Sequence, residues 1–231
     1  MKMTLRRTLI VGLVLASGFT GFTHAAAAAS SQISPWITIH VHNYGGVAPK
    51  TMAEAEEVAT GIFQKAGVES RWAEVVLTTE NGQENLADHP ARTLADIQLN
   101  IYPRMMSDRN GAPNNVMGLA PGSGPDRKIV YIFDSNVQAR FWRLWGARCS
   151  GRMDRQISKA QILGHAIAHE VGHLLLNQQI HSAHGIMRGE WGFTDFRDMT
   201  REMLLFTPQQ AELLRVDVRR RSGQQETLEV N

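Results

Sequence analysis

His169, Glu170 and His173 form the pattern H-E-x-x-H inside the stretch ILGHAIAHEVGHLLL (residues 162–176). Apolar residues recur at helical spacing through this stretch, so the motif is predicted to lie on a helix. Residues four apart share one helix face, which aims both imidazoles at one point and suits a tetrahedral Zn²⁺ site. Glu170 would project beside that point, where it can accept a proton from metal-bound water. The pattern therefore predicts metal-assisted activation of water.

A zinc site needs a further ligand beyond this pair. His165 lies on the same predicted helix, but at about 1.5 Å per residue it is roughly 12 Å from His173 along the axis, so one ion cannot reach both. His165 in a different pairing, or His181 or His184 beyond the helix end, could supply the ligand. Only the two downstream residues keep the glutamate beside a metal held by H-E-x-x-H. Asn177 tolerates the left-handed conformation and is a suitable place for the chain to turn back.

The residues after the motif resemble those of a known family. A turn, a third histidine followed by serine, and then a methionine are found at His181, Ser182 and Met187. This order is similar to that of the metzincin zinc peptidases, the matrixin-like ones most of all. The resemblance implies that His169, His173 and His181 are the zinc ligands. It also implies that Glu170 is the general base and that Met187 marks a tight turn under the metal. His184 remains the rival third ligand.

The chain departs from the family pattern after the helix. The pattern has a glycine three residues after the second histidine and the third histidine three residues later, where this chain has Leu176 and Gln179. His181 comes two residues late, so either the helix is longer by half a turn or the turn is wider. Gly189 stands in place of the proline that follows the methionine in the family.

Strand and helix patterns alternate along the rest of the chain. Predicted strands are Trp36–Tyr44, Val68–Thr78, Asp96–Tyr102, the short Val116–Ala120 and Lys128–Asp134. Predicted helices are Thr51–Ala66 with a capping box at its start, Asn136–Trp145, the motif helix, and Pro208–Arg219 capped by Thr207. The order resembles the metzincin upper subdomain. It implies an α+β, zincin-like fold: a twisted mixed sheet of about five strands packed on an N-terminal helix and the motif helix, then a small C-terminal part with the methionine turn and a final helix.

Several side chains outside the motif have two possible roles. An exposed edge strand can bind an extended peptide through its backbone, so Met117, Gly118, Leu119 and Ala120 are candidate substrate-binding residues, unless loops cover that edge. The aromatic residues near Trp191 either form a pocket wall or pack under the site. Phe141, Trp142 and Trp145 are expected in the core. Arg219–Arg221 is expected to be a solvated helix end, and Cys149 a buried or free thiol rather than a cap on the zinc.

Residues 1–29 have the pattern of a secretory signal, with Lys2, Arg6 and Arg7 before an apolar run and alanines at its end. Residues 30–231 are then expected to form a single domain, exported to the periplasm or the extracellular space, without stable membrane insertion. Three of the 24 Lys and Arg and none of the 22 Asp and Glu lie in the signal, so the remainder has 21 cations, 22 anions and a net charge of −1. This balance argues against nucleic acid as a partner.

The function expected from these features is that of a secreted zinc-dependent metalloendopeptidase. It would be a monomer acting on peptide or protein substrates, with zinc-activated water as the nucleophile and Glu170 as general base. The alternatives are a zinc-binding module without proteolytic activity, or a hydrolase of a non-peptide substrate on the same scaffold. A core helix whose histidines are merely hydrogen-bonded is a third reading.

Overall fold

The computed structural model describes residues 34–75, 93–103, 116–122, 124–149, 156–178 and 181–223. The predicted signal segment and the Cys149 side chain lie outside this description. The strands are β1 (Trp36–Asn43), β2 (Glu69–Glu74), β3 (Asp96–Tyr102), β4 (Gly118–Leu119) and β5 (Ile129–Phe133). The helices are α1 (Pro49–Lys65), α3 (Asp134–Cys149), α4 (Lys159–Leu175), α5 (Phe193–Met199) and α6 (Pro208–Ser222).

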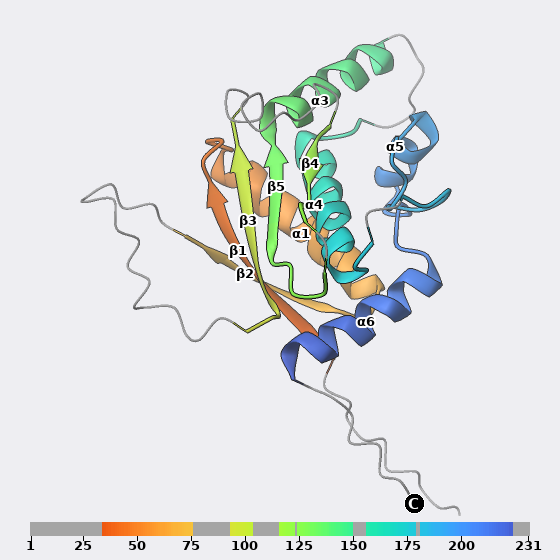
Figure 1. Cartoon of the computed structure of the whole chain (residues 1–231). Coiled ribbons are helices and arrows are strands. Elements are labelled where there is room, and N and C mark those ends of the chain that lie inside the picture. The colour runs from red at the N-terminus through yellow and green to blue at the C-terminus, as the bar shows by residue number, and fades with distance from the viewer. Residues whose placement is uncertain are drawn as a thin grey trace, which may run out of the picture. The chain divides into compact units, whose positions relative to one another are not determined.

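The five strands form one sheet in the order β2-β1-β3-β5-β4 (Figure 1). β1 runs parallel to β2 and β3, and β3 runs parallel to β5. β4 pairs antiparallel with β5 and lies at the edge, as the sequence predicts for this short strand. The predicted mixed sheet of five strands is therefore confirmed, with mostly parallel pairing.

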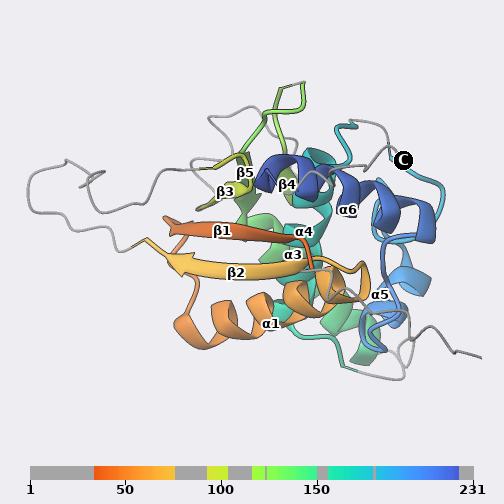
Figure 2. The same ribbon diagram turned by 90° about the horizontal axis from the view of Figure 1, so that it is seen from below.

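Alternation along the strands builds the core. Every second residue of the central strands is fully buried, namely Ile37, Ile39 and Val41 in β1 and Ile97, Leu99 and Ile101 in β3. These residues share one cluster with the buried faces of α1 and α4. Figures 1 and 2 show both helices against one face of the sheet. None of the helices in the described part of the chain is long and apolar enough to cross a lipid bilayer.

α4 is the central helix, and it carries the predicted motif. Ser158 caps its first turn in a capping box with Gln161, and every residue from Ile162 to Leu175 is buried. α1 differs from the prediction at its start. Pro49 is its first residue, and its ring already fixes the backbone for a first turn. No side chain caps the helix, because the N-cap residue is Ala48, which has no side-chain acceptor. The predicted capping box at Thr51 is wrong.

The two tryptophans of α3 are not core residues. Trp142 is 58% exposed and Trp145 is 36% exposed. Among residues 134–146 of this helix, the buried side chains are Val137 and Leu144, seven residues apart on the inward face. The expected core role of the two tryptophans is therefore wrong, and only Phe141 packs partly against the core.

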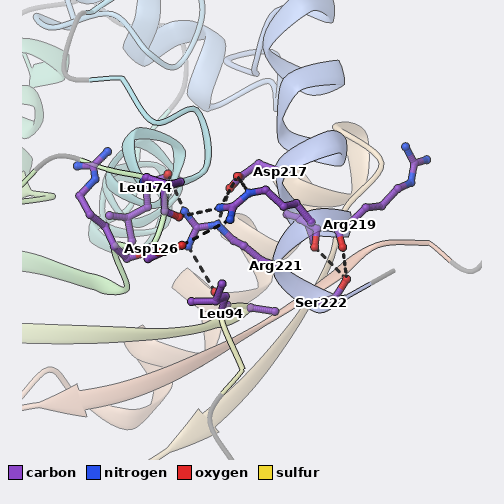
Figure 3. A network of polar contacts seen from close by, with 12 residues as sticks. Leu94, Asp126, Leu174, Asp217, Arg219, Arg221 and Ser222 are labelled. Atoms are coloured by element: carbon purple, nitrogen blue, oxygen red, sulfur yellow. Dashed lines mark hydrogen bonds and ion pairs between the residues drawn. The ribbon is translucent and has the colours of Figure 1, made fainter. Parts of the chain in front are cut away.

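The end of α6 is also less solvated than expected. Arg221 is only 3% exposed and pairs with Asp217 one turn earlier. Its guanidinium donates to the carbonyl of Leu174 in α4 at 3.0 Å (Figure 3). It also donates to the carbonyl of Arg127 at 2.8 Å. Burial of a charge is tolerated here because an anion and several carbonyl oxygens surround it. Arg221 thus ties α6 to the last turn of the motif helix.

Candidate metal centre

The site is built from the end of α4 and the segment that follows it. The helix ends at Leu175, and Asn177 has the left-handed φ of 49° that reverses the chain, as the sequence predicts. The helix is therefore not extended by half a turn, and His181 is reached after the turn at Asn177. This turn brings His181 back towards the two histidines of the motif.

Three imidazoles meet at one point. The Nε2 atom of His173 lies 3.1 Å from Nε2 of His169 and 3.3 Å from Nε2 of His181. A tetrahedral zinc ion with Zn–N distances of about 2.0–2.1 Å separates its nitrogen ligands by roughly 3.3–3.4 Å, so the spacing fits such an ion. His184 is exposed and is not in this cluster. Three histidines are therefore positioned to bind a metal.

Backbone carbonyls hold the rings in this orientation. Nδ1 of His169 lies 2.7 Å from the carbonyl oxygen of Ile186, and Nδ1 of His173 lies 2.8 Å from that of Gln178. A carbonyl can only accept, so each Nδ1 carries the hydrogen and donates it. Each Nε2 then keeps its lone pair for a metal, which is how carbonyls orient histidine ligands.

Burial favours the neutral form of these imidazoles. It lowers the pKa of His169 to about 4, and the neighbouring His173 and His181 contribute in the same direction. Burial is also the main cause that lowers the pKa of His173. Neutral imidazole is the form that binds a metal, so protons do not compete strongly for these two nitrogens at neutral pH.

Glu170 lies beside the histidines and against the edge strand. Its side chain packs so closely on Gly118 that a Cβ there would lie 2.5 Å from Cγ of Glu170. Burial raises the pKa of Glu170 to about 8, and a hydrogen bond from the Ala120 backbone partly opposes this rise. A carboxyl group poised in this range can take up and release a proton near neutral pH.

Met187 packs against the motif helix. Residues 185–188 make a tight turn, in which the Arg188 N–H donates to the Gly185 carbonyl at 3.2 Å. Met187 is 1% exposed and its sulfur lies against Gly172, between the two motif histidines on α4. The turn also supplies the Ile186 carbonyl, which accepts from His169 and, at 3.1 Å, from Nε1 of Trp191.

The histidines and Glu170 open into a cleft of about 670 Å³. One wall is residues 116–120, which include the predicted substrate-binding residues Met117, Gly118, Leu119 and Ala120. The other is residues 188–191, and α3 contributes two arginines, Arg140 and Arg143. Trp191 lines the cleft and also stands edge-on to His169 at 5.5 Å, so it combines both roles that the sequence allowed. The arginines were missed, because nothing in the sequence indicates that α3 borders the cleft.

Comparison with known proteins finds little similarity. No family model matches the chain, and no curated protein sequence matches it. Among solved structures, the crystal structure of archaemetzincin from Methanopyrus kandleri is similar with a TM-score of 0.43 and 14% sequence identity, over 80% of this chain and 95% of that one. At these values the site's own geometry has to carry any conclusion about function.

Proposed function

We propose that this protein is a zinc-dependent metalloendopeptidase of the metzincin type. The observation that carries the proposal is the convergence of three imidazole nitrogens beside a buried glutamate, in a cleft bordered by an edge strand. In this proposal, His169, His173 and His181 hold the zinc ion. The domain would act as a monomer after export, once residues 1–29 have been removed.

Zinc, when bound by three neutral imidazoles, supplies Lewis acidity towards water and towards the substrate carbonyl. Glu170 accepts the proton of the attacking water and returns it to the leaving amine. The N–H of Ala120 holds the glutamate in place during both transfers. The outer side of β4 would offer backbone groups to an extended peptide, which would place the scissile bond over the histidines.

Glu170→Gln is the first test of this assignment. The variant should keep one zinc per chain and lose at least about 100-fold in cleavage of a mixed peptide pool, because general base catalysis is worth about 10²–10⁴-fold. Metal content by elemental analysis and cleavage by mass spectrometry measure the two properties. Glu54→Gln, at an exposed position of α1, is the matched control and should change neither. Substantial cleavage by Glu170→Gln would remove the base assignment.

The ligand set is tested in the same experiment with two histidine variants. His181→Ala should lose zinc, because it removes one of the three converging nitrogens, whereas His184→Ala should keep it. Stoichiometric zinc without cleavage of any peptide would instead favour a zinc-binding module or a hydrolase of another substrate. Failure of the unaltered chain to bind zinc would contradict the proposal altogether.

A further inference from the structure

Two arginines of α3 border the cleft without a described anionic partner. Arg140 and Arg143 lie one helical turn apart, and both line the cleft that contains the three histidines. Arg140 is half-buried, and its guanidinium lies 5.8 Å from the ring centroid of Phe196 in α5. Among the described residues, neither guanidinium makes a hydrogen bond or an ion pair. Their donors therefore point to no fixed acceptor in this part of the chain.

The other charged residues of the cleft are arranged differently. Arg188 donates to Asp195 at 2.9 Å, so its charge is already compensated. Glu190 is close enough to raise the pKa of Arg140, but burial and the neighbouring Arg143 lower it and prevail. The α3 side of the cleft thus has two cations, Arg140 and Arg143. The nearby carboxylate of Glu190 forms no ion pair with either of them among the described residues.

Two adjacent guanidinium groups repel each other, and an anion between them removes that repulsion. A carboxylate suits this position, because its two oxygens match the planar donor fork of arginine. The attraction is stronger than at an open surface, because Arg140 is partly withdrawn from water. A cationic or apolar substrate group would leave both guanidinium groups without compensation.

We propose that Arg140 and Arg143 bind a carboxylate group of the peptide substrate, so that the enzyme selects peptides with an acidic group at a fixed distance from the cleaved bond. This inference builds on the proposed peptidase function and names its substrate class. An Asp or Glu side chain and a free peptide C-terminus present the same carboxylate. The two sources differ in one respect, since a C-terminal carboxylate also fixes how many residues follow the cleaved bond.

Peptide binding to the zinc-loaded Glu170→Gln variant tests the proposal without requiring turnover. A peptide from the cleaved pool, or an unstructured peptide if none is cleaved, is prepared with Asp scanned through successive positions. Each Asp peptide has an Asn counterpart, and each free C-terminus has an amide counterpart. Affinities are measured by fluorescence anisotropy in the Glu170→Gln background, alone and combined with Arg140→Gln or Arg143→Gln. Arg71→Gln, on β2 at the opposite edge of the sheet from β4, is the matched control.

We expect Asp to bind about tenfold more tightly than Asn at one position, as for a hydrogen bond to a charged group. This preference for Asp should shrink to about twofold or less in Arg140→Gln and Arg143→Gln and persist in Arg71→Gln. If the carboxylate and the arginine contact each other directly, the effects of changing the peptide and changing the arginine are not additive. A preference for the free C-terminus instead, with the same dependence on the arginines, would assign the carboxylate to the peptide end. Equal affinities for every acid and its amide counterpart would overturn the inference.

The cleavage assay separates this inference from the proposed function. Cleavage by the unaltered enzyme without any preference for acidic peptides would leave the peptidase assignment intact and reject the carboxylate site. Arginine-dependent binding of acidic peptides without any cleavage would keep the carboxylate site and reject the peptidase assignment.

Discussion

The backbone approaches two functional side chains so closely that only glycine fits. A Cβ at Gly118 would meet Glu170, and a Cβ at Gly189 would lie 2.8 Å from Nδ1 and 2.9 Å from Cγ of His181. Real Cβ atoms essentially never approach heavy atoms below 3.0 Å, so a larger residue must displace the side chain it meets. These glycines therefore help to set the positions of the proposed base and the third imidazole.

Gly189→Ala should weaken zinc binding. The added methyl group pushes the His181 ring away from the other two, and disturbing the support of a metal ligand costs about 10–100-fold in affinity. Competition with a chromogenic chelator would measure the change. Gly61→Ala is the matched control, since a Cβ at this helical position meets nothing within 4 Å. Equal zinc affinity in both variants would show that the ring moves without cost.

The sequence predicts the metal-binding and catalytic residues of the site better than it predicts the residues that hold them in position. The spacing of His169 and His173 predicts one helix face, and Asn177 predicts the turn that returns the chain. The clash at Gly118 was not predictable, because it depends on how closely β4 approaches α4. Any glycine in a short strand would look the same in the sequence.

At the scale of elements, Arg127 joins the edge strand to the motif helix. Its guanidinium donates to the carbonyl of Ala120 at 3.2 Å and to that of His173 at 2.7 Å. It also donates to the carbonyls of Gly122 and Gly124 in the loop after β4. The charge lies at the C-terminal end of α4, where the helix dipole favours a cation. The Arg127 side chain thus fixes the edge-strand side of the cleft relative to the motif helix α4.

Arg127→Lys should keep the charge and lose this arrangement, because an ammonium group cannot span several carbonyls as a planar fork does. We expect the free energy of unfolding to fall by about 2 kcal/mol, since several carbonyls, most of them partly buried, lose charged donors. Peptide cleavage should fall more than zinc content does, because β4 is released while the imidazoles remain. Urea denaturation and kinetics measure both changes. Arg197→Lys, exposed on α5, is the control; identical behaviour of the two variants would contradict this role.

The elements themselves were largely predictable. Asp96–Tyr102 has the predicted bounds because its apolar residues alternate, and α6 begins at Pro208 because Thr207 and the proline mark a helix start. Arg127 and Arg221 were not predictable as internal ties. A long cation near a helix end is usually solvated, and only the tertiary packing reveals the carbonyls that these two side chains reach.

At the scale of the whole protein, the metal should connect α4 to the segment that carries His181. In the metal-free protein, buried histidines make the free energy of unfolding depend on pH. The pKa of His165 is lowered from 6.5 to about 4, mainly by burial, so the unfolded chain binds its proton at a higher pH than the folded one. The contribution of the neutral His165 to the free energy of unfolding is therefore fully present above about pH 6.5 and is lost as the pH falls towards 4.

Chelator-treated protein should therefore unfold at lower urea concentration at pH 5 than at pH 7. His165 alone accounts for about 3 kcal/mol between pH 6.5 and pH 4, at about 1.4 kcal/mol per pKa unit. His165→Gln should flatten this dependence. Added zinc should raise the midpoint at pH 7, because a ligand that binds only the folded state stabilises it. A urea midpoint that changes with neither pH nor zinc would contradict the assignment of buried, neutral, metal-binding histidines.

The position of Trp191 has an optical consequence. Its indole stands edge-on to a proposed zinc ligand and shares a carbonyl acceptor with it, while the other tryptophans lie in β1, β2 and α3. Emission from this buried ring should respond to what the three imidazoles hold. Cobalt(II), a paramagnetic ion that can occupy zinc sites, should quench it, whereas diamagnetic zinc should not. The protein thus contains its own fluorescent reporter of metal occupancy, readable in solution without any substrate.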